Sequence, residues 1–250
     1  GAAAACLTLA LPNLGMAEDP APGMTTGGDT APATEPAPSV TTPEAAPAPQ
    51  VEPPKEVSAL LARVFKNLPA ANTSFAFKSW PQAGKPTEEG VGMMPLSGVS
   101  PEAIVKRVMD VDHYKGNIDH VIENRSIKDS RFTPPQAVRF YQHLDLSLLG
   151  DIHHELVLVD GGMRDGYRVL YWYLLEKESS ALKRDVGMRS AYNVGAWIIS
   201  KDKIGYALSS APKKDDTNYL QWKSLTSGAD LAAKSVVEDN IKGMVAWAKR

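Results

Sequence analysis

From residue 120 onward, apolar and polar residues alternate over six short segments, and this alternation is the feature that most constrains the fold. A period of two is typical of β-strands, whose successive side chains point to opposite faces of a sheet. Links such as Asp160-Gly161-Gly162 and Asp165-Gly166 separate the segments, and links this short join antiparallel neighbours. The predicted strands cover residues 120–128, 136–146, 152–160, 166–176, 189–200 and 203–210.

Helical periodicity flanks these strands. Residues 55–68 carry apolar side chains at spacings of three and four, which predicts an amphipathic helix. A short strand is predicted over 89–98, and Ser100 and Pro101 then begin a second helix as N-cap and first residue. A short helix over 112–118 and a long amphipathic helix over 230–249 complete the module. This order predicts an α+β fold in which a curved antiparallel sheet wraps around the C-terminal helix.

Three stretches of the module resemble the START (steroidogenic-acute-regulatory-related lipid transfer) and polyketide-cyclase-like superfamily, SRPBCC. They lie within residues 98–114, 138–157 and 220–236, and the resemblance extends over about residues 57–249. It implies the helix-grip fold and a function of the lipid-transfer type. The chain departs from the family pattern at Asn117, where the family usually has Trp, and at His153-His154, which replace Arg-Asp.

The first residues have the composition of an export signal. Residues 2–14 are small and apolar, and a cut after Ala17 would have small residues at positions −3 and −1. The apolar run is too short to span a membrane. We therefore expect residues 1–17 to be the remnant of a signal peptide. A lipid anchor on Cys6 is an alternative, because Ala3-Ala4-Ala5-Cys6 resembles a lipobox, although the leucines that follow speak against it.

Residues 18–54 are expected to form a disordered linker, because they contain ten of the 19 prolines and no basic or aromatic residue. A signal followed by a spacer predicts a periplasmic or extracellular protein. The folded domain then covers residues 55–250, with all 27 basic and only 23 of the 29 acidic residues. This mild excess argues against nucleic-acid binding and is compatible with transient contact with a membrane surface.

Several classes of chemistry are excluded by what the module lacks. Its sequence has no cysteine, P-loop, dinucleotide-binding fingerprint or G-x-S-x-G motif. Adjacent strand residues point to opposite faces, so His153-His154-Glu155 does not form a zinc site. His143 and His153 lie on neighbouring strands and could meet, but no carboxylate cluster joins them. We predict neither a metal nor a cofactor.

The strand around residues 167–175 is apolar on both faces. One face could pack on the helix at 55–68, and the other could line a ligand cavity. Arg139, Tyr141 and His143 share one face of their strand, and Phe140 and Gln142 share the other, more apolar face; the sequence does not decide which lines the cavity. The candidate ligand-binding residues are Asn117, Tyr141, His143, His153, Glu155, Tyr171, Tyr173, Tyr192, Trp197, Asn240 and Met244.

The first functional hypothesis is a monomeric, non-enzymatic carrier that encloses one hydrophobic ligand, such as a sterol, a phospholipid or another lipid. The alternative is a cyclase/aromatase-type or hydrolase-type enzyme on the same fold, with His143 or His153 beside Tyr141 or Glu155 as an acid–base pair. A third reading is an interaction module with a filled core. A cavity between the sheet and the terminal helix would favour the first two over the third.

Overall fold

The computed structural model describes residues 52–145, 150–175, 187–227 and 229–250. The predicted signal and nearly all of the predicted linker lie outside these residues, so the domain boundaries at 17 and 54 stay predictions.

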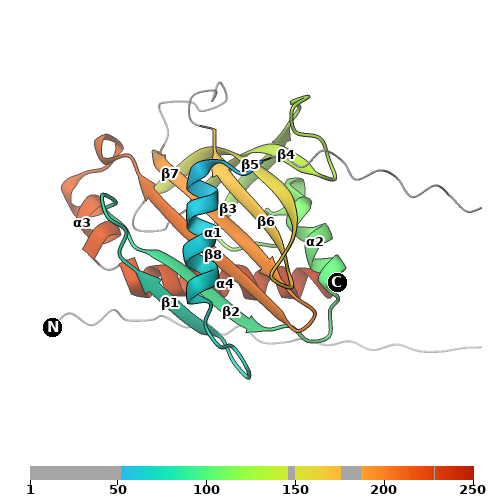
Figure 1. Cartoon of the computed structure of the whole chain (residues 1–250). Helices are drawn as coiled ribbons and strands as arrows, with labels where there is room; N and C mark the ends of the chain where they lie inside the picture. The colour runs from blue at the N-terminus through green and yellow to red at the C-terminus, as the bar shows by residue number, and fades with distance from the viewer. Residues whose placement is uncertain (1–51, 146–149, 176–186, 228) are drawn as a thin grey trace, which may run out of the picture. The chain divides into compact units, whose positions relative to one another are not determined.

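One eight-stranded sheet forms the centre of the module (Figure 1). Its strands run in the order β1-β2-β8-β7-β6-β5-β4-β3, and every neighbouring pair is antiparallel. Their bounds are β1 (Ala76–Trp80), β2 (Glu89–Pro95), β3 (Val121–Ile127), β4 (Ala137–Asp145), β5 (Asp151–Arg164), β6 (Tyr167–Leu174), β7 (Met188–Ile199) and β8 (Lys203–Pro212). The six strands predicted from residue 120 onward are confirmed as β3 to β8.

Turn chemistry explains why these strands form a meander. Asp165 and Gly166, between β5 and β6, both have positive φ angles, 48° and 82°. Two consecutive positive φ values characterise the type I′ turn, whose twist matches that of a two-stranded ribbon and which favours Asp-Gly. Beyond the end of β6, β5 and β7 pair directly with each other, at His153 and Arg189.

A strand, a helix and the 3-10 turn at 214–216 were not predicted, and one strand is longer than expected. β1 lies in a polar, proline-containing stretch, and it is an edge strand whose residues are half-buried or exposed. Without a continuous apolar face, it leaves no periodic signal. The short helix α3 (Tyr219–Ser227) has little amphipathic character. β5 continues to Arg164 through a register shift between Asp160 and Met163, past the predicted end at 160.

Helices cover both faces of the sheet (Figure 1). α1 (Lys55–Asn67) lies on one face, and α2 (Pro101–Met109) and α4 (Ala229–Ala248) pack against the other. Short 3-10 turns, η1 (Val111–His113) and η4 (Lys214–Asp216), join these elements to the sheet. The short helix predicted over 112–118 is wrong, because only η1 is helical there and Lys115 and Ile118 form an isolated β-bridge. The predicted start of α2 is confirmed, because the Ser100 hydroxyl accepts a hydrogen bond of 3.1 Å from the Ala103 N–H.

The covered sheet has a hydrophobic core on each side. Val57, Leu60, Leu61 and Val64 of α1 are fully or almost fully buried against one set of alternate strand residues. α2 and α4 bury Ile104, Val108, Val237, Ile241 and Trp247 against the other set. Burial on both sides explains the continuous apolar run in β6, since Val169 and Tyr171 face α1 while Leu170 and Trp172 face α4.

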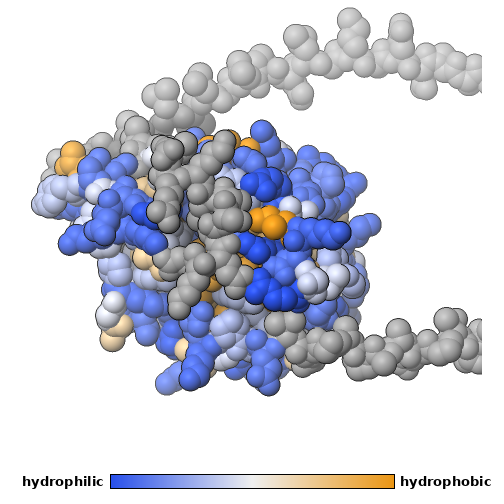
Figure 2. Space-filling model, turned by 90° about the horizontal axis from the view of Figure 1, so that it is seen from above, coloured by the Kyte–Doolittle hydropathy of each residue, from blue (hydrophilic) through white to orange (hydrophobic). Residues whose placement is uncertain are grey.

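The face of the molecule seen from above is mainly polar where the described residues are visible (Figure 2). Figure 2 shows mainly hydrophilic side chains in the view from above, with hydrophobic ones isolated among them. Within the part of the chain that the structure describes, no helix is both long enough and apolar enough to cross a membrane.

Candidate ligand cavity

A cavity of about 280 Å³ lies between the sheet and α4. Residues of β4 to β8 form one wall, and residues of α4 form the opposite wall. Residues 114–121, the approach to β2 and α3 contribute the rest of the lining. The cavity therefore occupies the side of the sheet that α1 does not cover.

Most of the wall is apolar and aromatic. Phe140, Leu156 and Leu158 project from β4 and β5, facing Val236 and Val237 of α4. Such a surface binds the apolar part of a ligand by removing it from water, at roughly 25 cal/mol per Å².

Three aromatic rings of the lining pack against one another. The ring centroid of Tyr206 lies 5.0 Å from that of Trp172 and 4.6 Å from that of Trp197. Burial raises the pKa of the Tyr206 phenol, so its hydroxyl stays protonated at neutral pH. Aromatic residues of this kind provide a large apolar area with one polar tip.

A buried histidine forms one polar part of the cavity. His154 Nε2 lies 2.9 Å from Gln142 Oε1, and His154 Nδ1 lies 3.1 Å from Ser190 Oγ. Burial, with smaller contributions from His153 and His143, lowers the pKa of His154 to about 3. The imidazole is therefore neutral at physiological pH.

A buried asparagine forms a second polar part. The Trp172 indole N–H donates a hydrogen bond of 2.8 Å to Asn193 Oδ1, and Asn193 is only 6% exposed. On α4, the Asn240 amide donates a hydrogen bond of 2.7 Å to the Val236 carbonyl. Asn240 thus satisfies a backbone acceptor one turn earlier in its own helix.

The charges around the cavity are negative. Glu88 and Asp119 contribute carboxylates to the lining. None of the described residues that line the cavity is a Lys or an Arg. No group of three or more potential metal-binding side chains occurs among the described residues.

No protein-family model and no curated protein matches this sequence, but its fold matches solved structures. A fragment of the STAR-related lipid transfer protein from Xanthomonas axonopodis aligns with 74% of this chain and 98% of its own length, at 12% identity and a TM-score of 0.58. Human STARD10 aligns over 80% of each chain at 16% identity, with a TM-score of 0.59. The chain has the helix-grip fold.

A third helix-grip structure, human StAR-related lipid transfer protein 5, covers 78% of this chain and 96% of its own at 10% identity, with a TM-score of 0.56. The predicted fold and the predicted resemblance to the START and polyketide-cyclase-like superfamily are thus confirmed at the level of the fold. At sequence identities of 10–16%, the similarity to these structures shows the fold alone. The ligand has to be argued from the cavity itself.

The helix-grip cavity contains two of the eleven residues suggested by the sequence, Trp197 and Asn240. Met244 of α4 is fully buried in the core and does not line the cavity. Asn117 lies outside the lining as well. Its amide donates to the His113 carbonyl, and its oxygen accepts a hydrogen bond from Arg250, so Asn117 contacts the C-terminal end of the chain instead.

The other suggested residues belong to the strand face that α1 covers, and this corrects the sequence-based choice of cavity-facing residues. Strand side chains alternate, and the opposite set, Phe140, Gln142, His154 and Leu156, faces the cavity. The residues that point away from it are Tyr141, His143, His153, Glu155, Tyr171, Tyr173 and Tyr192.

The two histidines suggested as a pair do meet on that far face. The rings of His143 and His153 stack with centroids 3.9 Å apart, and His143 Nε2 lies 3.0 Å from Asp151 Oδ2. The Tyr141 hydroxyl hydrogen-bonds to His153 Nδ1. Burial and the neighbouring His143 lower the pKa of His153. A cluster of acid–base groups exists, but the sheet separates it from the cavity.

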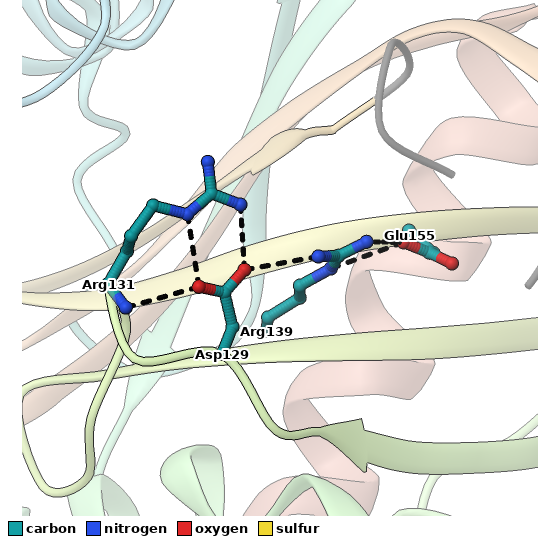
Figure 3. Close-up of polar contacts among 4 residues, drawn as sticks. All are labelled: Asp129, Arg131, Arg139 and Glu155. Atoms are coloured by element: carbon teal, nitrogen blue, oxygen red, sulfur yellow. Dashed lines mark hydrogen bonds and ion pairs between the residues drawn. The ribbon is translucent and has the colours of Figure 1, made fainter. Parts of the chain in front are cut away.

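Glu155 belongs to an ion-pair network on the far face (Figure 3). Arg139 Nη2 lies 2.6 Å from the fully buried Glu155 carboxylate, and Arg139 Nη1 lies 3.1 Å from Asp129. Asp129 also accepts a hydrogen bond of 2.7 Å from Arg131. The hydrogen bonds from Arg131 and Arg139 hold the pKa of Asp129 well below its usual range. This network joins the loop before β4 to the sheet and does not contact the cavity.

Among the polar lining residues that the sequence did not reveal, Gln142, His154 and Asn193 lie on the central strands. Gln142 lies in the more apolar of the two alternating sets of β4, next to Phe140 and Leu144. A polar residue that interrupts an apolar strand face is the signal that could have revealed it. His154 was overlooked because its neighbour His153 was predicted to lie in the cavity, and adjacent strand residues point to opposite faces.

Proposed function

We propose that this protein is a non-enzymatic carrier that encloses one hydrophobic molecule between the sheet and α4. The observation that carries the proposal is an apolar cavity with a few buried polar groups, inside a helix-grip fold. Two of the similar structures are named as lipid transfer proteins, which supports a lipid as the ligand. Exchange of the ligand requires α4, or the segment from Ser209 to Thr217 at the end of β8, to move away from the sheet.

The proposal is tested by filling the cavity from α4. Val236 lines the cavity, while Ala246 lies on the exposed side of the same helix. Lipid that co-purifies with the full chain is measured by native mass spectrometry and solvent extraction. We expect Val236→Trp to lose at least nine-tenths of the bound lipid and Ala246→Trp to keep it. Absence of lipid from the wild-type protein, together with no binding to a panel of lipids, would contradict the proposal.

An enzymatic role is less well supported. A cyclase or hydrolase of this fold would need an acid–base pair facing its substrate. The groups suggested for it, His143, His153, Tyr141 and Glu155, lie on the opposite face of the sheet from the cavity. Within the cavity, the only described histidine that is fully buried is His154, whose low pKa makes it a poor base at neutral pH. Turnover of a bound molecule that depends on His154 would favour the enzyme instead.

We also propose that the protein is exported. The support is the apolar, small-residue composition of residues 2–14 and the proline-rich stretch at 18–54. Fractionation of the producing cell and mass analysis of the mature N-terminus test this proposal. A chain that begins at Glu18 indicates cleavage, a lipid on Cys6 indicates an anchor, and an uncleaved chain in the cytosol excludes both. Monomeric state and transient membrane contact stay predictions.

A further inference from the structure

Two amide side chains of the cavity, Gln142 and Asn193, have the same orientation: a neighbouring side chain of the protein contacts the amide oxygen, and the amide nitrogen has no acceptor among the described residues. We propose that the cavity selects an uncharged lipid that offers an acceptor oxygen, a carbonyl or hydroxyl, over an anionic lipid. This inference rests on the proposed carrier function and specifies its ligand class.

Asn193 provides the clearest donor. An indole N–H can only donate, so the 2.8 Å contact from Trp172 identifies the Asn193 atom facing it as the amide oxygen. The amide nitrogen is then directed elsewhere on a side chain that is more than nine-tenths buried and that lines the cavity. Among the described residues, none accepts a hydrogen bond from this nitrogen. A ligand oxygen in the cavity would satisfy it.

Gln142 of β4 repeats this arrangement on the same side of the sheet. Its Oε1 is only an acceptor, so the 2.9 Å contact places the proton of the neutral His154 on Nε2. His154 Nδ1 then accepts from the Ser190 hydroxyl at 3.1 Å. The Gln142 amide nitrogen has no acceptor among the described groups and belongs to the cavity lining. Gln142 and Asn193 therefore both offer N–H groups whose orientation is set by a second residue.

Tyr206 adds a third donor between the rings of Trp172 and Trp197. Its hydroxyl has no hydrogen-bond partner among the described residues, and it lines the cavity. All three donors are uncharged. A neutral oxygen gains a hydrogen bond from them, whereas a phosphate or carboxylate would also need a compensating positive charge.

The lining lacks that charge. It includes the carboxylates of Glu88 and Asp119, and no Lys or Arg among its described residues. An anionic headgroup would be desolvated there without a compensating cation from the described lining residues. The volume of about 280 Å³ lies just below the usual range of about 300–1,000 Å³ for ligand pockets. The cavity therefore fits one chain or one compact ring system better than a two-chain phospholipid.

The test uses probes of equal chain length and different heads. Binding of 2-dodecanone, 1-dodecanol and dodecanoate to the full chain is measured at pH 8, where the acid is ionised, by displacement of a fluorescent lipid. We expect the ketone and the alcohol to bind at least tenfold more tightly than dodecanoate. Equal or tighter binding of dodecanoate overturns the inference and leaves the carrier function standing. Failure of every probe, with no co-purified lipid, contradicts the carrier function as well.

Asn193→Asp isolates the donor, because it keeps the oxygen that Trp172 needs and replaces the amide nitrogen by an oxygen. We expect it to weaken 2-dodecanone binding about tenfold, the scale of one lost hydrogen bond plus repulsion. Asn67→Asp, the same change at the end of α1 on the opposite face, is the matched control. Tyr206→Phe, which breaks no described hydrogen bond, serves as a second probe and should cost two- to fivefold. Unchanged ketone affinity in both cavity variants overturns the assignment.

Discussion

At the scale of single residues, the burial of His154 couples folding to pH. Its pKa is about 3 in the folded protein, and an unfolded histidine has a pKa near 6.5. Between these values the unfolded chain binds the extra proton. Stability from this residue is therefore fully present above about pH 6.5 and is lost as the pH falls toward 3.

We predict that His154→Gln flattens this dependence. Relative to the variant, the wild-type free energy of unfolding should fall by about 2 kcal/mol between pH 6.5 and 5, since one pKa unit corresponds to about 1.4 kcal/mol. Urea unfolding at a series of pH values measures it. The control is His113→Gln, because Asp110 raises the pKa of exposed His113 and its small contribution is lost as the pH rises. Parallel curves for wild type and His154→Gln would refute the prediction.

Gly195 makes room for one wall of the cavity. A Cβ at this position would lie 2.0 Å from the Trp172 ring and 2.4 Å from the Ala207 carbonyl oxygen. The backbone oxygen cannot move aside easily, so Gly195→Ala should cost about 2 kcal/mol by overpacking. It should also shift the Trp172 ring and its fluorescence. Ala191→Val, at an exposed position of the same strand, is expected to change stability by less than about 0.5 kcal/mol.

At the scale of elements, one ion pair fixes α1 to the sheet. The Glu89 carboxylate on β2 is fully buried and accepts hydrogen bonds from Arg63 at 2.7 and 2.8 Å and from Trp80 at 3.0 Å. Burial acts to raise the pKa of Glu89, but the hydrogen bonds and the positive charges of Arg63 and Lys85 outweigh it, and the pKa is lowered. Glu89 is therefore ionised, and it needs its partners.

We predict that Arg63→Met destabilises the protein by about 3 kcal/mol, because it removes the main partner of a buried charge. The exposed pair of Arg125 and Glu123 is the comparison, and Arg125→Met should cost less than about 1 kcal/mol. Chemical denaturation measures both. If the two variants lost equal stability, the Glu89 contact would be no more than a surface ion pair.

The elements that have a clear hydrophobic period and are bounded by turn residues could be predicted from the sequence. Which face of each strand lines the cavity could not. β4 to β8 follow from alternation and from links such as Asp165-Gly166, while edge strand β1 lacks a continuous apolar face. Which side of β4 faces the cavity could not be deduced, because the sheet is buried on both faces and each face carries apolar residues. The candidate site was therefore placed on the Tyr141 side. Only the position of α1, a long-range contact, settles the question.

At the scale of the whole molecule, a cavity inside the core links stability to occupancy. A ligand that binds only the folded state stabilises it by about 2.7 kcal/mol when its concentration is a hundred times Kd. For a domain of this size that corresponds to about 5–10 °C in Tm. We expect delipidation to lower Tm by this amount and 2-dodecanone to restore it. Identical melting of delipidated and loaded protein would contradict preferential binding of the ligand to the folded state.

Because the sheet is buried on both faces, its two sets of alternate residues are under different constraints when the sequence varies in evolution. Along each central strand, one alternate set of residues holds α1 in place, and the next set touches whatever fills the cavity. Variation can therefore accumulate at every second position of the same strand without disturbing the other half. A new ligand preference could be evolved, or engineered, at Phe140, Gln142 and His154 while their immediate neighbours keep the module folded.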